Sequence, residues 1–159
     1  RYGGYIVHIG IVLMFVGFSG KAFDQESEFA LKQGDTQEFN GYNFELVSII
    51  PQERPNHMAW IAGLNVWNMQ HQLVTTLFPE KRVYFHRDPN PDKRQPHSEL
   101  DIYGTVNKDI YSIFSGVDME QRIAYLKIMI NPLVWWVWFG GYILVFGTVI
   151  SLWPAREGS

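Results

Sequence analysis

Two long apolar blocks constrain this chain more than any other feature of its sequence. Residues 3–20, "GGYIVHIGIVLMFVGFSG", and residues 132–153, "PLVWWVWFGGYILVFGTVISLW", contain no charged side chain. A helix needs about 20 apolar residues, at about 1.5 Å each, to cross the hydrocarbon core of a bilayer. Tryptophans lie at both ends of the second block, as they do at membrane–water interfaces: Trp135, Trp136, Trp138 and Trp153. The sequence therefore predicts two transmembrane helices.

The ends of these blocks predict how the chain is organised. Asn131 can cap a helix that starts at Pro132, because Asn accepts hydrogen bonds at an N-cap and Pro fits the first helical turn. We expect transmembrane helices at residues 1–23 and 132–154. A β-rich domain at residues 24–131 lies between them, and a short tail follows at residues 155–159.

The few charges near the helix ends favour one orientation. Two spans place both chain ends on the same side of the membrane. Arg1 and Arg156 favour the cytoplasm for that side, and Lys21 weakly opposes it. The expected fold class is thus membrane α plus β, with two transmembrane helices flanking a small antiparallel β-rich extracytoplasmic domain.

Short strands are predicted throughout the central segment. The pair Asn40–Gly41 is typical of a two-residue hairpin turn, and Gln33–Asp35 is a second turn signal. Tyr42, Phe44 and Leu46 then alternate with polar residues, as in a strand with one buried face. Further strands are predicted at Trp60–Val66, 81–86 and 123–130, an exposed proline-rich loop at 86–97, and either a helical turn or a strand edge at 107–116.

Composition excludes several classes of function. A net charge of −3 provides no basic surface, so we expect no nucleic-acid partner. Without cysteine the chain can form neither a disulfide nor a thiolate metal site. The histidines of the central segment lack the usual spacing of metal ligands, and we expect them at the surface: His57, His71, His86 and His97. Lys81, Arg82 and Arg87 form either a solvated strand face or a contact for a propionate or an acidic partner.

His8 is the one ionisable residue inside an apolar block. Such a residue is costly within a membrane span and usually marks a functional site. Burial in hydrocarbon favours the neutral imidazole, which is a good ligand for iron or another metal. A backbone carbonyl one turn away, that of Gly4, could accept a hydrogen bond from the second ring nitrogen. Gly4 also leaves space beside the ring for a flat macrocycle.

The helical period places His8 on one face with Gly4, Ile11, Val12 and Phe15. These residues would line a haem to which His8 is an axial ligand. A second ligand must come from elsewhere, because the second block contains no His, Cys or Met. An interhelical hydrogen bond, worth about 0.6 kcal/mol, explains His8 equally well on residue chemistry alone.

Small residues form a stripe along each block. The members are Gly3, Gly10 and Gly17 in the first block and Gly140, Gly147 and Ser151 in the second. Such stripes allow two helices to approach closely. In the first block the stripe lies opposite His8, so we expect this helix to have two packing faces and to belong to a larger bundle.

Five segments, taken in order, resemble the C-terminal portion of the CcmF family of cytochrome c maturation haem lyases, including its NrfE-type members. They are "RYGGYIVHIG", "LKQGD", "LFPEKRVYF", "GTVNKDIYSIFSG" and "INPLVWWVWFGGYILVFGTVISLWP". The resemblance covers essentially the whole chain and about the last quarter of the family protein. It implies a multi-pass protein of the bacterial inner (cytoplasmic) membrane, in contact with the lipid bilayer, whose central domain is periplasmic.

The resemblance also implies a role in haem attachment. Family members join haem vinyl groups to the CXXCH thiols of apocytochrome c. They receive haem from the chaperone CcmE and work with CcmH-type and CcmI-type subunits. They hold a transmembrane haem b between two membrane histidines, and His8 corresponds to one of them. On this basis we expect His8 to bind haem b, and the β-rich domain to be a docking surface.

Three elements of the family are absent from this sequence. They are the other membrane histidine, two periplasmic histidines and a tryptophan-rich motif that ends in aspartate. The stretch "WWVWFGGY" at Trp135–Tyr142 lacks that aspartate and is expected at the membrane interface. We therefore predict no catalytic residue here, and expect the rest of a CcmF chain or a complementary chain as partner. The alternative is a two-span structural or receptor subunit with a partner-binding β domain and no haem.

Overall fold

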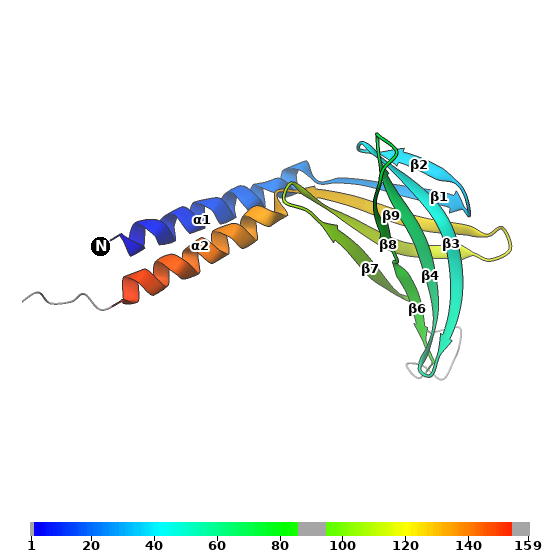
Figure 1. The fold of residues 1–159 in the computed structure, drawn as a ribbon. Helices are drawn as coiled ribbons and strands as arrows, with labels where there is room; N and C mark the ends of the chain where they lie inside the picture. Colours follow the sequence, from blue (N-terminus) through cyan, green and yellow to red (C-terminus); the bar gives the residue numbers. More distant parts are fainter. Residues whose placement is uncertain (1, 86–94, 154–159) are drawn as a thin grey trace, which may run out of the picture. The chain divides into compact units, whose positions relative to one another are not determined.

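The chain forms two apolar helices and a nine-stranded sheet in a computed structural model that describes residues 2–85 and 95–153 (Figure 1). The helices are α1 (Gly3–Ser19), the 3-10 helix η1 (Gly20–Phe23) and α2 (Val134–Leu152). The strands are β1 (Gln25–Lys32), β2 (Thr36–Phe39), β3 (Tyr42–Arg54), β4 (His57–Asn68), β5 (Leu73–Leu77), β6 (Glu80–Tyr84), β7 (His97–Gly104), β8 (Lys108–Asp118) and β9 (Ile123–Pro132).

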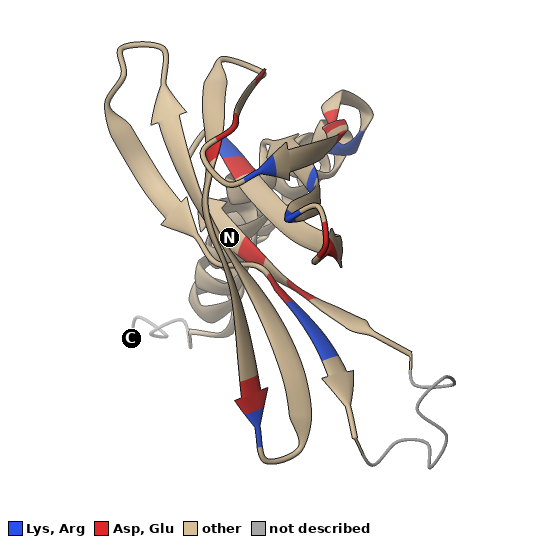
Figure 2. Ribbon diagram, turned by 90° about the vertical axis from the view of Figure 1, so that its right-hand side faces the viewer, with Lys and Arg blue, Asp and Glu red and all other residues tan. Residues whose placement is uncertain are grey.

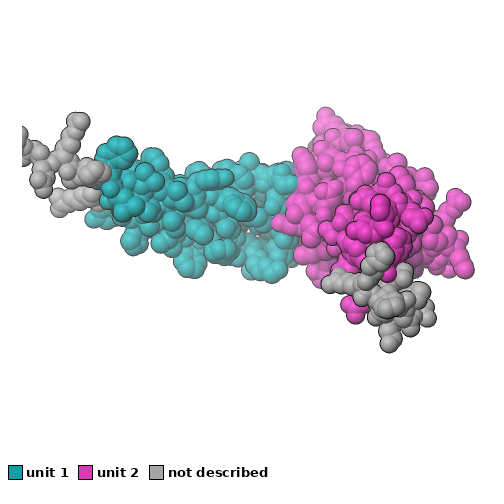
Figure 3. Space-filling view, turned by 90° about the horizontal axis from the view of Figure 1, so that it is seen from below, with its two compact units in different colours: residues 1–24, 104–109, 131–159 teal, residues 25–103, 110–130 magenta. Residues whose placement is uncertain are grey.

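These elements belong to two compact units (Figure 3). The first unit comprises Arg1–Asp24, Gly104–Asp109 and Asn131–Ser159, and it contains both helices. The second comprises Gln25–Tyr103 and Ile110–Ile130, and it contains the body of the sheet.

The helices α1 and α2 pack against each other through their small residues, as predicted. A Cβ atom added to Gly10 would lie 2.6 Å from the backbone nitrogen of Leu144, and one added to Gly17 would lie 2.6 Å from that of Val137. Contacts this short mean that only glycine fits at these positions. The segments Gly3–Phe23 and Val134–Leu152 are each long and apolar enough to cross a membrane, judged by length and composition.

The predicted cap of the second helix is wrong. Strand β9 continues to Pro132, and α2 starts only at Val134. Leu133 makes the turn between them with a φ of 66° and donates its N–H to the carbonyl of Asn107. The ladder between β9 and β1 extends to Ile130. Asn131 therefore stays extended, and this pairing overrides the local capping signal.

The sheet is an antiparallel meander in which the strands follow the order β1-β9-β8-β7-β6-β4-β3-β2, with β5 also paired to β4. Asn40 and Gly41 have φ values of 50° and 77° and connect β2 to β3, so the predicted hairpin is confirmed. The ambiguous stretch 107–116 lies largely in strand β8. Residues 86–94 of the predicted proline-rich loop lie outside the described residues.

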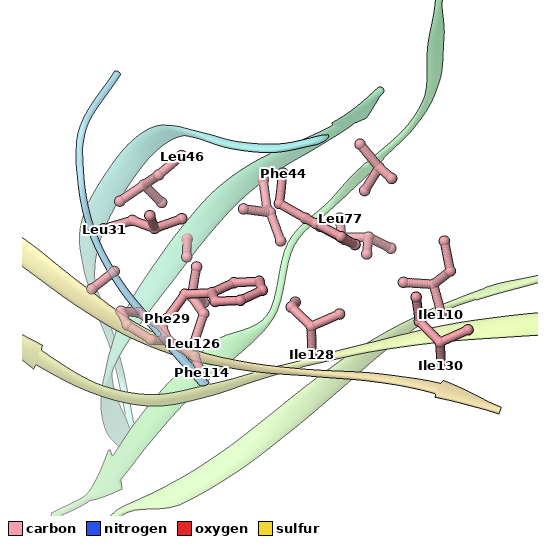
Figure 4. Packing of buried hydrophobic residues seen from close by; sticks show 14 residues of the cluster. Phe29, Leu31, Phe44, Leu46, Leu77, Ile110, Phe114, Leu126, Ile128 and Ile130 are labelled. Carbon is pink, nitrogen blue, oxygen red and sulfur yellow. The ribbon is translucent and has the colours of Figure 1, made fainter. Parts of the chain in front are cut away.

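The core lies between opposing parts of this curved sheet (Figure 4). Rings from β1, β2 and β3 meet there, with the centroids of Phe29 and Phe39 5.9 Å apart and those of Phe29 and Phe44 6.0 Å apart. The predicted strand at Trp60–Val66 is confirmed within β4, where Ala62, Leu64 and Val66 are fully buried. The sheet thus forms a sandwich that approaches a closed barrel.

Charged residues lie on the strands, their turns and η1, whereas α1 and α2 contain none (Figure 2). The two helices therefore differ from the sheet in charge, although the unit that contains them also includes Lys21, Asp24, Lys108 and Asp109.

Candidate haem-ligand site and polar surfaces

The imidazole of His8 is held by its own helix. Its Nδ1 lies 2.7 Å from the carbonyl oxygen of Gly4, one turn earlier in α1. Because a carbonyl oxygen can only accept, Nδ1 must carry the proton and donate it. In the neutral ring the lone pair then lies on Nε2, the nitrogen available to a metal. The hydrogen bond predicted from the sequence is confirmed.

The face of α1 that contains His8 is turned away from α2. Val12 and Phe15 are 60% and 68% exposed, and Ile11 also lies at the surface. A Cβ atom added to Gly4 would meet no atom within 4 Å, so there is open space beside the ring. In the part of the chain that the structure describes, His8 forms no hydrogen bond to α2. The donor set and the space therefore fit an axially ligated macrocycle.

The histidines of the sheet differ from the surface positions predicted for them. His57 is only 6% exposed, and its ring packs against Tyr84 with centroids 5.0 Å apart. His97 starts β7 and contacts the other side of Tyr84 at 5.8 Å. His57 was predicted at the surface and His97 in the exposed loop 86–97, and both predictions are wrong because β4, β6 and β7 pair at this point. His71 is exposed as predicted, and His86 lies outside the described residues.

The described histidines of the sheet do not form a metal site. Within residues 2–85 and 95–153, no three His, Asp or Glu side chains gather closely enough to hold a metal ion. Nδ1 of His57 lies 2.6 Å from Oδ1 of Asn56, which fixes the ring next to Tyr84. Burial of these rings is therefore part of the sheet's packing.

The two basic side chains of β6, Lys81 and Arg82, both have partners within the fold. Arg82 pairs with Glu80 at 2.8 Å and with Glu99 at 3.3 Å, and the hydrogen bond to Glu80 is the main cause of its raised pKa. Lys81 donates to the side chain of Ser98 and to the carbonyl of Ser115. These contacts favour a strand face over a contact for a propionate. Arg87 lies outside the described residues.

A polar row on the outer face of the sheet was not singled out from the sequence. It crosses four strands through Thr36, Glu45, Asn65 and Thr76, which are register partners. The available signal was the alternation along β3, because Asn43 and Glu45 alternate with the core residues Phe44 and Leu46. The cross-strand register that assembles the row cannot be read from one strand.

Comparisons with known proteins agree with this architecture. Residues 22–132 match the model of the family described as CcmF C-terminal β-sandwich. The chain is 30% identical to cytochrome c-type biogenesis protein ccl1 of Rhodobacter capsulatus over 159 residues, which cover 99% of this chain and 23% of that protein. It is 24% identical to cytochrome c-type biogenesis protein CcmF of Escherichia coli over 156 residues, covering 98% and 23% of the two chains.

A solved structure has the same fold. The structure of cytochrome c heme lyase CcmF matches with a TM-score of 0.72 and 22% identity, over 97% of this chain and 25% of that one. This chain therefore spans about a quarter of the length of the relatives that it matches.

Proposed function

This chain belongs to the CcmF C-terminal β-sandwich family, and from that premise we propose that it is the C-terminal part of a cytochrome c maturation haem lyase. In this role α1 and α2 cross the bacterial inner membrane, and His8 supplies one axial ligand to a membrane-embedded haem b. The second ligand and the groups that attach haem to apocytochrome c belong to the remainder of the protein. The sheet is a periplasmic docking domain for apocytochrome c, the haem chaperone CcmE and the CcmH-type and CcmI-type subunits.

The observation that supports this role most strongly is the hydrogen bond from Nδ1 of His8 to Gly4. It selects the tautomer in which Nε2 can bind iron, and it limits rotation of the ring. Gly4 contributes twice, because its carbonyl accepts this hydrogen bond and its missing side chain leaves the adjacent space open. Ile11, Val12 and Phe15 give the same face an apolar surface on which a porphyrin ring would pack.

Bound haem b would supply one-electron redox chemistry at this position. His8 would anchor it and set the donor strength of one axial position through the Nδ1 hydrogen bond. No residue of this chain is assigned to the formation of the thioether bond.

The experiment compares variants of the complete membrane complex by haem absorbance and by the yield of c-type cytochrome. His8→Ala should remove the Soret band of the membrane haem and abolish cytochrome maturation. Gly4→Leu keeps the imidazole but fills the adjacent space, and it should reduce the same band.

Gly141→Leu is the matched control, since a Cβ atom at Gly141 also meets nothing within 4 Å but lies on α2. It should leave the haem spectrum unchanged. If His8→Ala retains both the Soret band and maturation, the alternative of a structural or receptor subunit without haem replaces this proposal.

The proposed orientation has a separate test. Because this chain contains no cysteine, Gln121→Cys in the exposed β8–β9 turn introduces its single thiol. A membrane-impermeant maleimide added to intact spheroplasts should label that thiol. Protection until the membrane is opened would mean that the domain faces the cytoplasm.

A further inference from the structure

A hollow of about 420 Å³ lies on the sheet face opposite the hydrophobic core. Thr36, Asn43, Glu45, Trp67 and His71 line it. Along β3 the residues Phe44 and Leu46 are fully buried in the core, so Asn43 and Glu45, which alternate with them, point to the other face. The hollow belongs entirely to the strands β2, β3 and β4 and to the turn after β4.

The carboxylate of Glu45 is held in one orientation by neutral donors. Trp67 Nε1 donates to Glu45 Oε2 at 2.9 Å, and Asn65 Nδ2 donates to the same oxygen at 3.4 Å. Asn65 is itself oriented, because its Oδ1 accepts a hydrogen bond of 2.8 Å from Thr76. Oε1 of Glu45 accepts no hydrogen bond from residues 2–85 or 95–153, so a pre-positioned acceptor lies at the hollow.

This carboxylate forms no ion pair within the described residues, and its two donors are neutral. Glu38 lies opposite Asn43 in the register and adds a second negative charge on the same face. Glu45 also lines a neighbouring hollow together with Lys32 and Arg122, but neither of these cations forms an ion pair with it. A half-buried, unpaired carboxylate next to an indole ring favours a cationic ligand.

We propose that this hollow, defined by Thr36, Asn43, Glu45, Trp67 and His71, binds a Lys or Arg side chain of a polypeptide partner. The ammonium or guanidinium group donates to Oε1 of Glu45, and the aliphatic stem lies against the ring of Trp67. The hydroxyl of Thr36 and the amide oxygen of Asn43 offer further acceptors. This inference does not depend on haem ligation by His8.

The test uses the full chain in detergent micelles with 15N-labelled tryptophan. The probe is the peptide acetyl-Gly-Lys-Gly-amide, and the control ligand is the same peptide with an Nε-acetylated lysine. Trp67→Phe assigns the indole N–H signal of Trp67, which reports directly on the hydrogen bond to Glu45. The lysine peptide should shift this signal in a saturable way, and the acetylated peptide should not.

Glu45→Gln keeps an oxygen acceptor for Trp67 but removes the charge, and it should weaken binding about tenfold or more. Glu53→Gln changes the net charge equally at an exposed position further along β3, and it should have no effect. Unchanged signals from the other tryptophans show that each variant is folded. The inference is overturned if the lysine peptide leaves the Trp67 signal unmoved, if both peptides shift it equally, or if Glu45→Gln binds like the wild type.

Discussion

At the scale of single residues, the buried hydroxyl of Ser112 lowers the stability of the fold. Ser112 is fully buried in β8, and its Oγ has no hydrogen-bond partner in the described part of the chain. A buried polar group without a partner costs free energy that alanine does not. Ser112→Ala should therefore raise the free energy of unfolding, by about 1 kcal/mol.

Ser98→Ala is the matched control, measured by thermal unfolding of the full chain in detergent. Ser98 donates to the carbonyl of Phe114 and accepts from Lys81, so its loss should lower the melting temperature. If Ser112→Ala is destabilised as much as Ser98→Ala, the hydroxyl of Ser112 has a partner that this account omits.

Asp109, the second residue of β8, makes the stability of the fold depend on pH. Burial raises the pKa of this carboxyl above its ordinary value of 3.8, although the backbone N–H of Thr105 opposes the shift. The folded state thus holds the proton more tightly than the unfolded state. The contribution of Asp109 to the free energy of unfolding is complete below pH 3.8. It is lost as the pH rises through the pKa of the folded state.

The free energy of unfolding, measured between pH 3 and 7, tests whether the stabilisation by Asp109 falls as the pH rises. Asp109→Asn keeps the acceptor for Thr105 but cannot ionise, so it should be more stable relative to the wild type at pH 7 than at pH 3. A stability difference that stays constant over this range would contradict the assignment.

Among the elements, the two helices depend on glycines at their interface. Gly10→Leu places a side chain against the backbone of Leu144 and should destabilise the pair by about 1–3 kcal/mol. Gly141→Leu introduces the same side chain where nothing lies within 4 Å, so it should be tolerated. The melting of the helical circular dichroism signal measures both variants. Equal melting temperatures would mean that α1 and α2 do not pack through this stripe.

The elements also show why some features can be predicted and others cannot. The apolar helices, the glycine stripes and the hairpin at Asn40–Gly41 depend on neighbouring residues, and all three are confirmed. The start of α2 depends on how far β9 pairs with β1, which no local signal reports. Burial of His57 depends on pairing between β4 and β6, which are separated in the sequence by β5, so the residues around His57 do not report it.

For the whole molecule, the proposed haem site would be only partly contained in this chain. The Nδ1 hydrogen bond of His8 and the open space at Gly4 were predicted because a helix brings residues four apart into contact. The relatives are about four times longer, and we propose that their additional segments cover the exposed face of Val12 and Phe15. The polar row at Glu45 was missed because it joins residues from four strands.

Direct detection of the bond between His8 and iron tests the central claim. The measurement is pulsed electron paramagnetic resonance of the oxidised, complete complex with 15N-labelled histidine, in the wild type and in His8→Met. The account predicts nitrogen couplings from two coordinated imidazoles in the wild type and from only one in His8→Met. Identical couplings in the two proteins would show that His8 does not bind the iron.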